Sequence, residues 1–369
     1  MSSIKSREPP PIPRPSSSVL LISPTNQTLL LHRVHTSSSF PSAHVFPGGA
    51  LSATHDGAIP PVDSPLRHRD GPAYRLAAVR ETFEECGILL ATSKLTGRLF
   101  TDVGDAEREA ARKNVHAGTE LFADVLERWG AVPDTEGLVP CSRWITPLGL
   151  PKRFSTMMYI YFLPVGSQSP TTRSPTSSSP DPDPDPDPRS TPADLGSASA
   201  PAIVIPHPTH DGGIEHTAAR FLPAHSWLAL ARQNRIILFP PQFFLLHILS
   251  PYLSPRVTSP SSPPPSLSAL QTERSRLLAF LAERSGAEPS FAEACVSPVV
   301  LGKGRDGSRT TVLGLASPGV EVGTGRSGFA EWVVMARFTG EGPRDVEVRR
   351  RAEVYDGDGG FGGKGSAVL

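Results

Sequence analysis

Residues 80–88 of this chain read RETFEECGI, and they close a predicted helix that spans residues 73–86. Leu76, Val79 and Phe83 recur along that helix at spacings of three and four residues, which places their side chains on one face. A glycine follows the last helical residue, where helices commonly end in a left-handed turn. The stretch therefore predicts an amphipathic helix with a defined end.

Three carboxylates share the opposite side of this helix. Glu81, Glu84 and Glu85 are spaced i, i+3 and i+4, so they project together, away from the apolar face. Like charges at this spacing repel by roughly 0.2–0.5 kcal/mol per pair. Two interpretations follow: a solvated acidic face, or a site where Mg²⁺ takes oxygen ligands and keeps waters, one of which becomes a nucleophile.

The surroundings of the helix favour the second interpretation. Strands are predicted at residues 18–23 and 28–34, and Pro47-Gly48-Gly49 then forms a bend at which backbone can approach a ligand. A polar loop at residues 53–71 leads into the helix.

The rest of the chain alternates between periodic and Pro-rich segments. Further helices are expected at residues 105–129, 225–233, 241–253 and 267–285, and further strands at 43–46, 138–146, 157–164, 202–205, 311–315, 330–338 and 346–351. We expect the strands at 157–164 and 202–205 to pair as a hairpin. Residues 166–200, rich in Ser, Pro and Asp, form the predicted disordered loop between them.

These segments predict five regions, listed here in chain order: a disordered N-terminus (1–17), a main domain (18–254), a Pro/Ser linker (255–266), a C-terminal helix with strands (267–355) and a disordered Gly-rich tail (356–369). The mixture of helices and strands in the main domain favours the α+β class.

Composition excludes several classes of protein. Lys+Arg and Asp+Glu both number 36 in 369 residues, so nothing demands a nucleic-acid or membrane partner. Three scattered cysteines indicate an intracellular chain without a disulfide framework. No apolar run reaches the ~20 residues that span a bilayer, and no secretory or clear peroxisomal signal is present. The sequence does not indicate an oligomeric state.

Residues 80–88 resemble the second half of the Nudix box, G-x5-E-x7-R-E-U-x-E-E-x-G-U, with Thr82 as a poor apolar position. Gly49 matches the opening glycine, and His55 stands where the first glutamate belongs. Gly49 and Arg80 are 31 residues apart where the plain box has 14, an insertion of 31 − 14 = 17 residues. Collinear segments at residues 29–33, 40–49, 144–147, 152–156 and 240–242 make the chain similar to the type 19 (RP2-like), coenzyme A-cleaving branch.

The resemblance implies a Nudix hydrolase domain over residues 18–254, with a mixed sheet sandwiched between helices, and Mg²⁺ or Mn²⁺ as cofactor. Its implied site residues are Glu81, Glu84, Glu85 and also Glu215 as metal ligands, Arg80 as their ion-pair partner, and Gly48 and Gly49 beside the diphosphate. Arg33 and Arg153 are candidates for phosphate contact, because a guanidinium group matches phosphate at two points.

The implied reaction is hydrolysis of coenzyme A or an acyl-CoA to 3′,5′-ADP and (acyl-)4′-phosphopantetheine. Two alternatives stay open: a diphosphatase for ADP-ribose, NADH or a nucleotide sugar, and an inactive Nudix-like binding module, which His55 in place of the first glutamate favours. The branch suggests peroxisome or mitochondrion, with the cytosol as the alternative.

Overall fold

The computed structural model describes residues 10–36, 41–166, 205–209, 211, 215–253, 265–284, 288–303, 309–323 and 325–355. The predicted 166–200 loop beyond its first residue, most of the predicted linker and the 356–369 tail lie outside the described residues.

Strand β1 (Arg14–Ile22) is the centre of the molecule. Val19 and Leu21 pack into the core on one face of the sheet, and Leu20 and Ile22 pack into a second core on the other. A strand covered on both faces needs a continuous apolar run, which explains why its sequence does not alternate. The prediction that residues 1–17 are disordered is wrong for 14–17, since β1 begins at Arg14.

The central sheet is mixed and has eight strands. Along it, the order is β10-β7-β8-β1-β2-β3, while β4 also pairs with β1 and β9 with β2. The remaining strands are β2 (Thr28–Arg33), β3 (His44–Val45), β4 (Gly48–Ala50), β7 (Val139–Ile145), β8 (Phe154–Phe162), β9 (His216–Leu222) and β10 (Cys295–Val296). β8 runs parallel to β1 along all nine residues of both strands.

The predicted hairpin between residues 157–164 and 202–205 is wrong. β8 is flanked by β7 on one side and β1 on the other, so neither edge is open to a returning strand. Ile205, the one residue of the 202–205 segment that the structure describes, is not in a strand. The returning strand is β9, which joins the sheet beside β2 instead.

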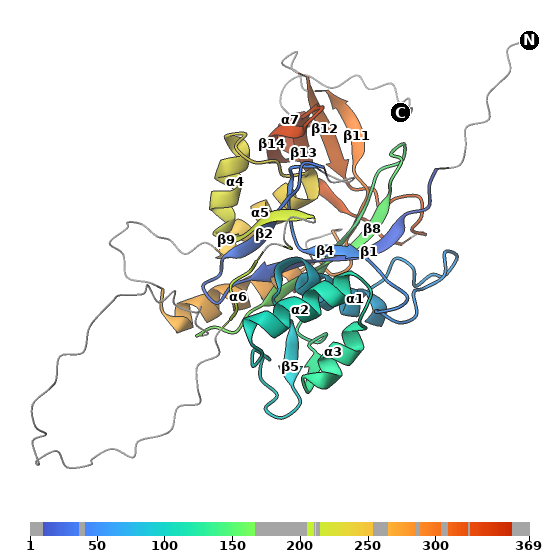
Figure 1. The fold of residues 1–369 in the computed structure, drawn as a ribbon. Helices are drawn as coiled ribbons and strands as arrows, with labels where there is room; N and C mark the ends of the chain where they lie inside the picture. The colour runs from blue at the N-terminus through green and yellow to red at the C-terminus, as the bar shows by residue number, and fades with distance from the viewer. Residues whose placement is uncertain are drawn as a thin grey trace, which may run out of the picture.

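One face of the sheet is covered by α1 (Pro72–Cys86), α2 (Asp105–His116) and α3 (Phe122–Arg128), with the small ribbon of β5 (Ala91–Ser93) and β6 (Ala131–Pro133) beside them (Figure 1). The single helical region expected at 105–129 is thus two helices. The chain turns between them at Gly118, whose φ of 69° is the left-handed conformation that favours glycine.

The other face carries the rest of the chain (Figure 1). The elements here are α4 (Ala224–Arg232), α5 (Pro240–Leu253), α6 (Leu267–Ala282), a four-stranded sheet of β11 (Val299–Lys303), β12 (Thr310–Leu315), β13 (Phe329–Thr339) and β14 (Gly342–Arg350), and α7 (Arg351–Tyr355). Leu277 and Phe329 share one core with β1, and β10 extends the central sheet.

The expected α+β class, with a mixed sheet between helices, is confirmed. Among the residues that the structure describes, no helix combines the length and the apolar character needed to cross a membrane.

Candidate active site

Helix α1 buries Glu84 and Glu85 and leaves Glu81 partly exposed. Pro72 starts the helix, Phe83 anchors it in the core, and Gly87, with a φ of 75°, ends it by donating its backbone N–H to the Phe83 carbonyl. Only 7% of Glu84 and 6% of Glu85 is exposed. The alternative of a solvated acidic face is therefore wrong.

The two glycines of the Pro-Gly-Gly bend lie directly against these carboxylates. Gly48 donates its backbone N–H to Oε2 of Glu85 at 2.7 Å. A Cβ on Gly49 would sit 2.5 Å from the carboxyl carbon of Glu81, closer than van der Waals contact allows. The bend thus packs against the glutamates, and its contact with a diphosphate stays a prediction.

Arg80 forms ion pairs with several carboxylates of the acidic cluster. Its guanidinium group contacts Glu81 at 2.9 Å and Glu84 at 2.7 Å, and it forms a two-point ion pair with Asp56 at 2.9 and 2.8 Å. The pairing of Arg80 with the glutamates agrees with the role that the box assigns to it.

Asp56 was missed by the sequence analysis. Counting along the box selected His55, but the His55 ring accepts a hydrogen bond from the backbone N–H of Phe122, outside the cluster. The neighbouring Asp56 is fully buried and faces Arg80. The available signal was a carboxylate one residue from the counted position.

Burial and charge separate the pKa values of the carboxylates. Burial raises the pKa of Glu81 to about 7, and burial also raises the pKa of Glu85 well above its ordinary value. Burial opposes ionisation of Glu84 too, but a hydrogen bond with His116 and the charge of Arg80 outweigh it and lower the pKa of Glu84. Carboxyl groups crowded in this way form a donor set suited to a divalent cation, whose charge would relieve their repulsion.

Glu215 and His216, at the start of β9, lie close to Glu85 of the acidic cluster. Glu215 lies beside Arg33 of β2, with 3.1 Å between their charged atoms. Single ligand atoms from Glu85, Glu215 and His216 lie within 4.8 Å of one another. Glu215, an expected ligand, is thus beside Glu85. His216 was not predicted, because nothing in the local sequence marks a histidine at the start of a strand as a site residue.

Arg153 does not join the cluster. Its guanidinium group is buried, donates to the carbonyls of Thr146, Pro147 and Pro11, and pairs with Glu321 at 2.5 Å. These partners lie before β1, just after the end of β7 and in the C-terminal segment. The structure therefore gives Arg153 a structural role in place of the predicted phosphate contact.

A second arginine holds the end of α1. Arg112 of α2 is 2% exposed and donates to the carbonyls of Glu84 and Glu85 at 2.6 and 2.8 Å. It also donates to the hydroxyl of Thr209. Carbonyls at a helix end lack partners within the helix, so Arg112 fixes the turn that carries the carboxylates.

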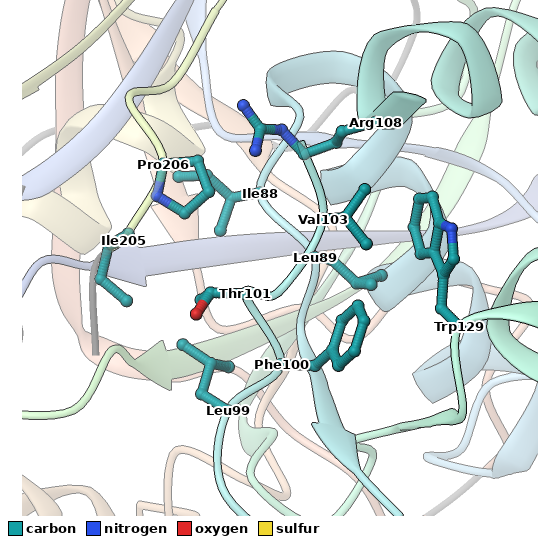
Figure 2. Close-up of a pocket in the computed structure, with 10 residues that line it drawn as sticks. All are labelled: Ile88, Leu89, Leu99, Phe100, Thr101, Val103, Arg108, Trp129, Ile205 and Pro206. Atoms are coloured by element: carbon teal, nitrogen blue, oxygen red, sulfur yellow. The ribbon is translucent and has the colours of Figure 1, made fainter. Parts of the chain in front are cut away.

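An apolar hollow lies beyond the end of α1 (Figure 2). Its lining includes Ile88, Leu99 and the stacked rings of Phe100 and Trp129. Its volume is about 20 Å³, enough for about one water-sized body. The hollow is therefore too small to hold the substrate in this conformation.

Residues 63–177 match the family model of the NUDT19 Nudix domain. The chain resembles the type 19 Nudix hydrolases. The acyl-coenzyme A diphosphatase NUDT19 of Gallus gallus is 30% identical over 183 residues, which cover 36% of this chain and 47% of the relative. The protein of the same name from Xenopus laevis is 26% identical over 176 residues, covering 36% and 46%. The chain spans about half the length of these curated relatives.

Solved structures also match this type 19-like chain. A Nudix hydrolase from Alicyclobacillus acidocaldarius aligns with a TM-score of 0.45 and 19% identity, over 69% of this chain and 98% of that one. We therefore base the description of the fold on the sheet order and cores of this chain itself.

Proposed function

We propose that this protein hydrolyses the pyrophosphate bond of a nucleoside diphosphate linked to a second moiety, with Mg²⁺ or Mn²⁺ as cofactor. One observation supports this above the others: Glu81, Glu84 and Glu85 lie together, partly or fully buried, between the Pro-Gly-Gly bend and Arg80. A buried group of carboxylates is costly unless it is paired or binds a metal, and one arginine cannot neutralise all three.

The carboxylates of α1, together with Glu215, are the groups that would hold the cation. When bound, a divalent cation supplies a polarised diphosphate and a water of lowered pKa. Arg80 keeps Glu81 and Glu84 in position, and Gly48 orients Glu85 through its N–H. A carboxylate of the cluster accepts the proton of the attacking water. The proposal also assigns a phosphate contact to Arg33, which lies next to Glu215.

The proposed substrate is coenzyme A or an acyl-CoA. Its support is the likeness to relatives named acyl-coenzyme A diphosphatase and the collinear segments that flank the box. Water adds across the P–O–P link, so one phosphate leaves on 3′,5′-ADP and the other on (acyl-)4′-phosphopantetheine. ADP-ribose, NADH and a nucleotide sugar are the substrates against which this proposal is tested.

The binding-module alternative loses its main support. It depended on the absence of the first box glutamate at His55, yet Asp56 provides a buried carboxylate that pairs with Arg80 at two points. A carboxylate one residue from the counted position is therefore present beside Arg80.

The decisive experiment is a turnover panel of coenzyme A, acyl-CoA, ADP-ribose, NADH and a nucleotide sugar with Mg²⁺ or Mn²⁺. Products are identified by mass, and Glu84→Gln is compared with the wild type. Appearance of 3′,5′-ADP with the wild type and its loss in the variant supports both substrate and site. Cleavage of another substrate rejects only the coenzyme A assignment, and no cleavage with either metal rejects the proposed activity.

A further inference from the structure

His216 is a fully buried histidine whose ring is held by a neighbouring carboxylate. Its Nδ1 lies 3.3 Å from Oδ2 of Asp211, and the same carboxylate accepts the backbone N–H groups of Glu215 and His216 at 2.8 and 3.1 Å. With Nδ1 donating to this carboxylate, the lone pair of the ring is on Nε2.

The other ring nitrogen has no such partner. Among the residues that the structure describes, Nε2 of His216 is buried and accepts or donates no hydrogen bond. Oε1 of Glu85 is 3.8 Å away, too far for a hydrogen bond. A buried polar atom without a partner is costly, so the position between Nε2 and Oε1 suits a cation that both atoms can bind.

We propose that His216 Nε2, Glu85 and Glu215 bind one divalent transition-metal ion, with Asp211 positioning the imidazole. Nitrogen and carboxylate ligands lie about 2.0–2.2 Å from such an ion, so two donors are at most about 4.4 Å apart. The three ligand atoms lie within 4.8 Å of one another, and Glu215, with 43% of its side chain exposed, has room to close the difference. A carboxylate behind a metal-binding histidine is the usual way to fix its tautomer and orientation.

The chemistry of this site differs from that of the other box carboxylates. Glu81 and Glu84 offer oxygen alone, which suits Mg²⁺, whereas an imidazole nitrogen favours a transition metal. This metal site rests on the proposed function, because Glu85 belongs both to the carboxylates of α1 and to the group of Glu215 and His216. It adds a metal preference at the end of the cluster where His216 lies. It predicts that the protein discriminates between Mn²⁺ and Mg²⁺ through His216.

The test uses the full chain loaded with Mn²⁺ and needs no turnover. Electron spin-echo envelope modulation detects ¹⁴N coupled to bound Mn²⁺, and continuous-wave spectra give the affinity. The wild type is expected to show ¹⁴N modulation that His216→Gln abolishes, with Mn²⁺ affinity falling at least about tenfold and Mg²⁺ affinity, measured by competition, changing less than about twofold. Asp211→Asn is expected to weaken Mn²⁺ binding by about 10- to 100-fold.

His116→Gln is the matched control, because His116 contacts Glu84 at the other end of the cluster. Loss of the ¹⁴N signal in this variant instead of His216→Gln overturns the proposal. A wild type that binds Mn²⁺ without ¹⁴N modulation also overturns it, and this arm holds even if a variant fails to fold. A ¹⁴N signal without cleavage of any panel substrate leaves the site standing and rejects the proposed activity alone.

Discussion

Asp56 and Arg80 are 24 residues apart in the chain, yet they form a buried two-point ion pair at 2.9 and 2.8 Å. The pair ties the loop before α1 to the helix that carries the carboxylates.

Asp56→Asn is expected to destabilise the fold, because it removes the charge of the buried carboxylate that contacts Arg80 at two points. Breaking a buried pair costs about 3–5 kcal/mol, and the remaining contacts of Arg80 with Glu81 and Glu84 put the cost near the lower end. Urea unfolding measures it. The exposed Asp63→Asn in the same loop serves as control, and equal stability of the two variants would count against the pair.

Gly49→Ala is expected to displace the carboxylate of Glu81, which lies 2.5 Å from the position of the added Cβ. A displacement of about 1 Å in a catalytic site costs on the order of 100-fold in rate, so we expect kcat to fall by about that factor. Gly71→Ala is the control, because its Cβ would meet nothing within 4 Å. Unchanged kcat in Gly49→Ala would remove Glu81 from the site.

The free energy of unfolding of the metal-free protein is expected to depend on pH, because Glu81 changes its protonation state between the folded and unfolded chain. Burial raises the pKa of Glu81 to about 7 from its ordinary 4.5, so the folded state holds a proton that the unfolded state releases. The free energy of unfolding therefore falls as pH rises from about 4.5 through 7. Thermal unfolding in EDTA between pH 5 and 8 should show the Tm of wild type declining relative to Glu81→Gln.

Saturating Mn²⁺ is expected to reverse this trend, because the cation binds the deprotonated carboxylates and so stabilises more at higher pH. Glu127→Gln, on the exposed surface of α3, should follow the wild type in both conditions. A Tm difference between wild type and Glu81→Gln that does not vary with pH would contradict the buried placement of Glu81.

Arg153→Met is expected to lower stability without changing KM, since Arg153 binds three backbone carbonyls and Glu321. Each carbonyl left without a donor costs about 1–3 kcal/mol. Parallel measurement of urea unfolding and steady-state kinetics separates the two roles. A large rise in KM with unchanged stability would restore the phosphate-contact prediction.

The sequence predicts what depends on local spacing. Helix α1, its end at Gly87 and the grouping of Glu81, Glu84 and Glu85 all follow from periodicity within 15 residues, and the structure has them as expected. The bend at Gly48 is also predicted from local sequence, because Pro47-Gly48-Gly49 permits backbone conformations that other residues rarely adopt.

The features that were missed depend on distant pairing. His216 lies near Glu85 because β9 pairs with β2, in a register that puts Arg33 opposite His216. The two strands are far apart in the sequence, so local spacing does not predict this pairing. The predicted hairpin between residues 157–164 and 202–205 is wrong for the same reason. β8 pairs in parallel with β1, a distant strand, and local sequence does not reveal that this edge of β8 is occupied. Arg153 is buried through Glu321, which lies 168 residues further along the chain (321 − 153).

The inserted loop is fastened at both ends. Asp56 holds its beginning to Arg80, while near its end His68 bonds Ser155 and the Arg69 carbonyl accepts from Arg143. The stretch between these anchors can therefore vary in length without moving a single carboxylate. The motif is present here as an arrangement in space and not as a string with fixed gaps, so a pattern search that demands the standard spacing will overlook enzymes built in this way.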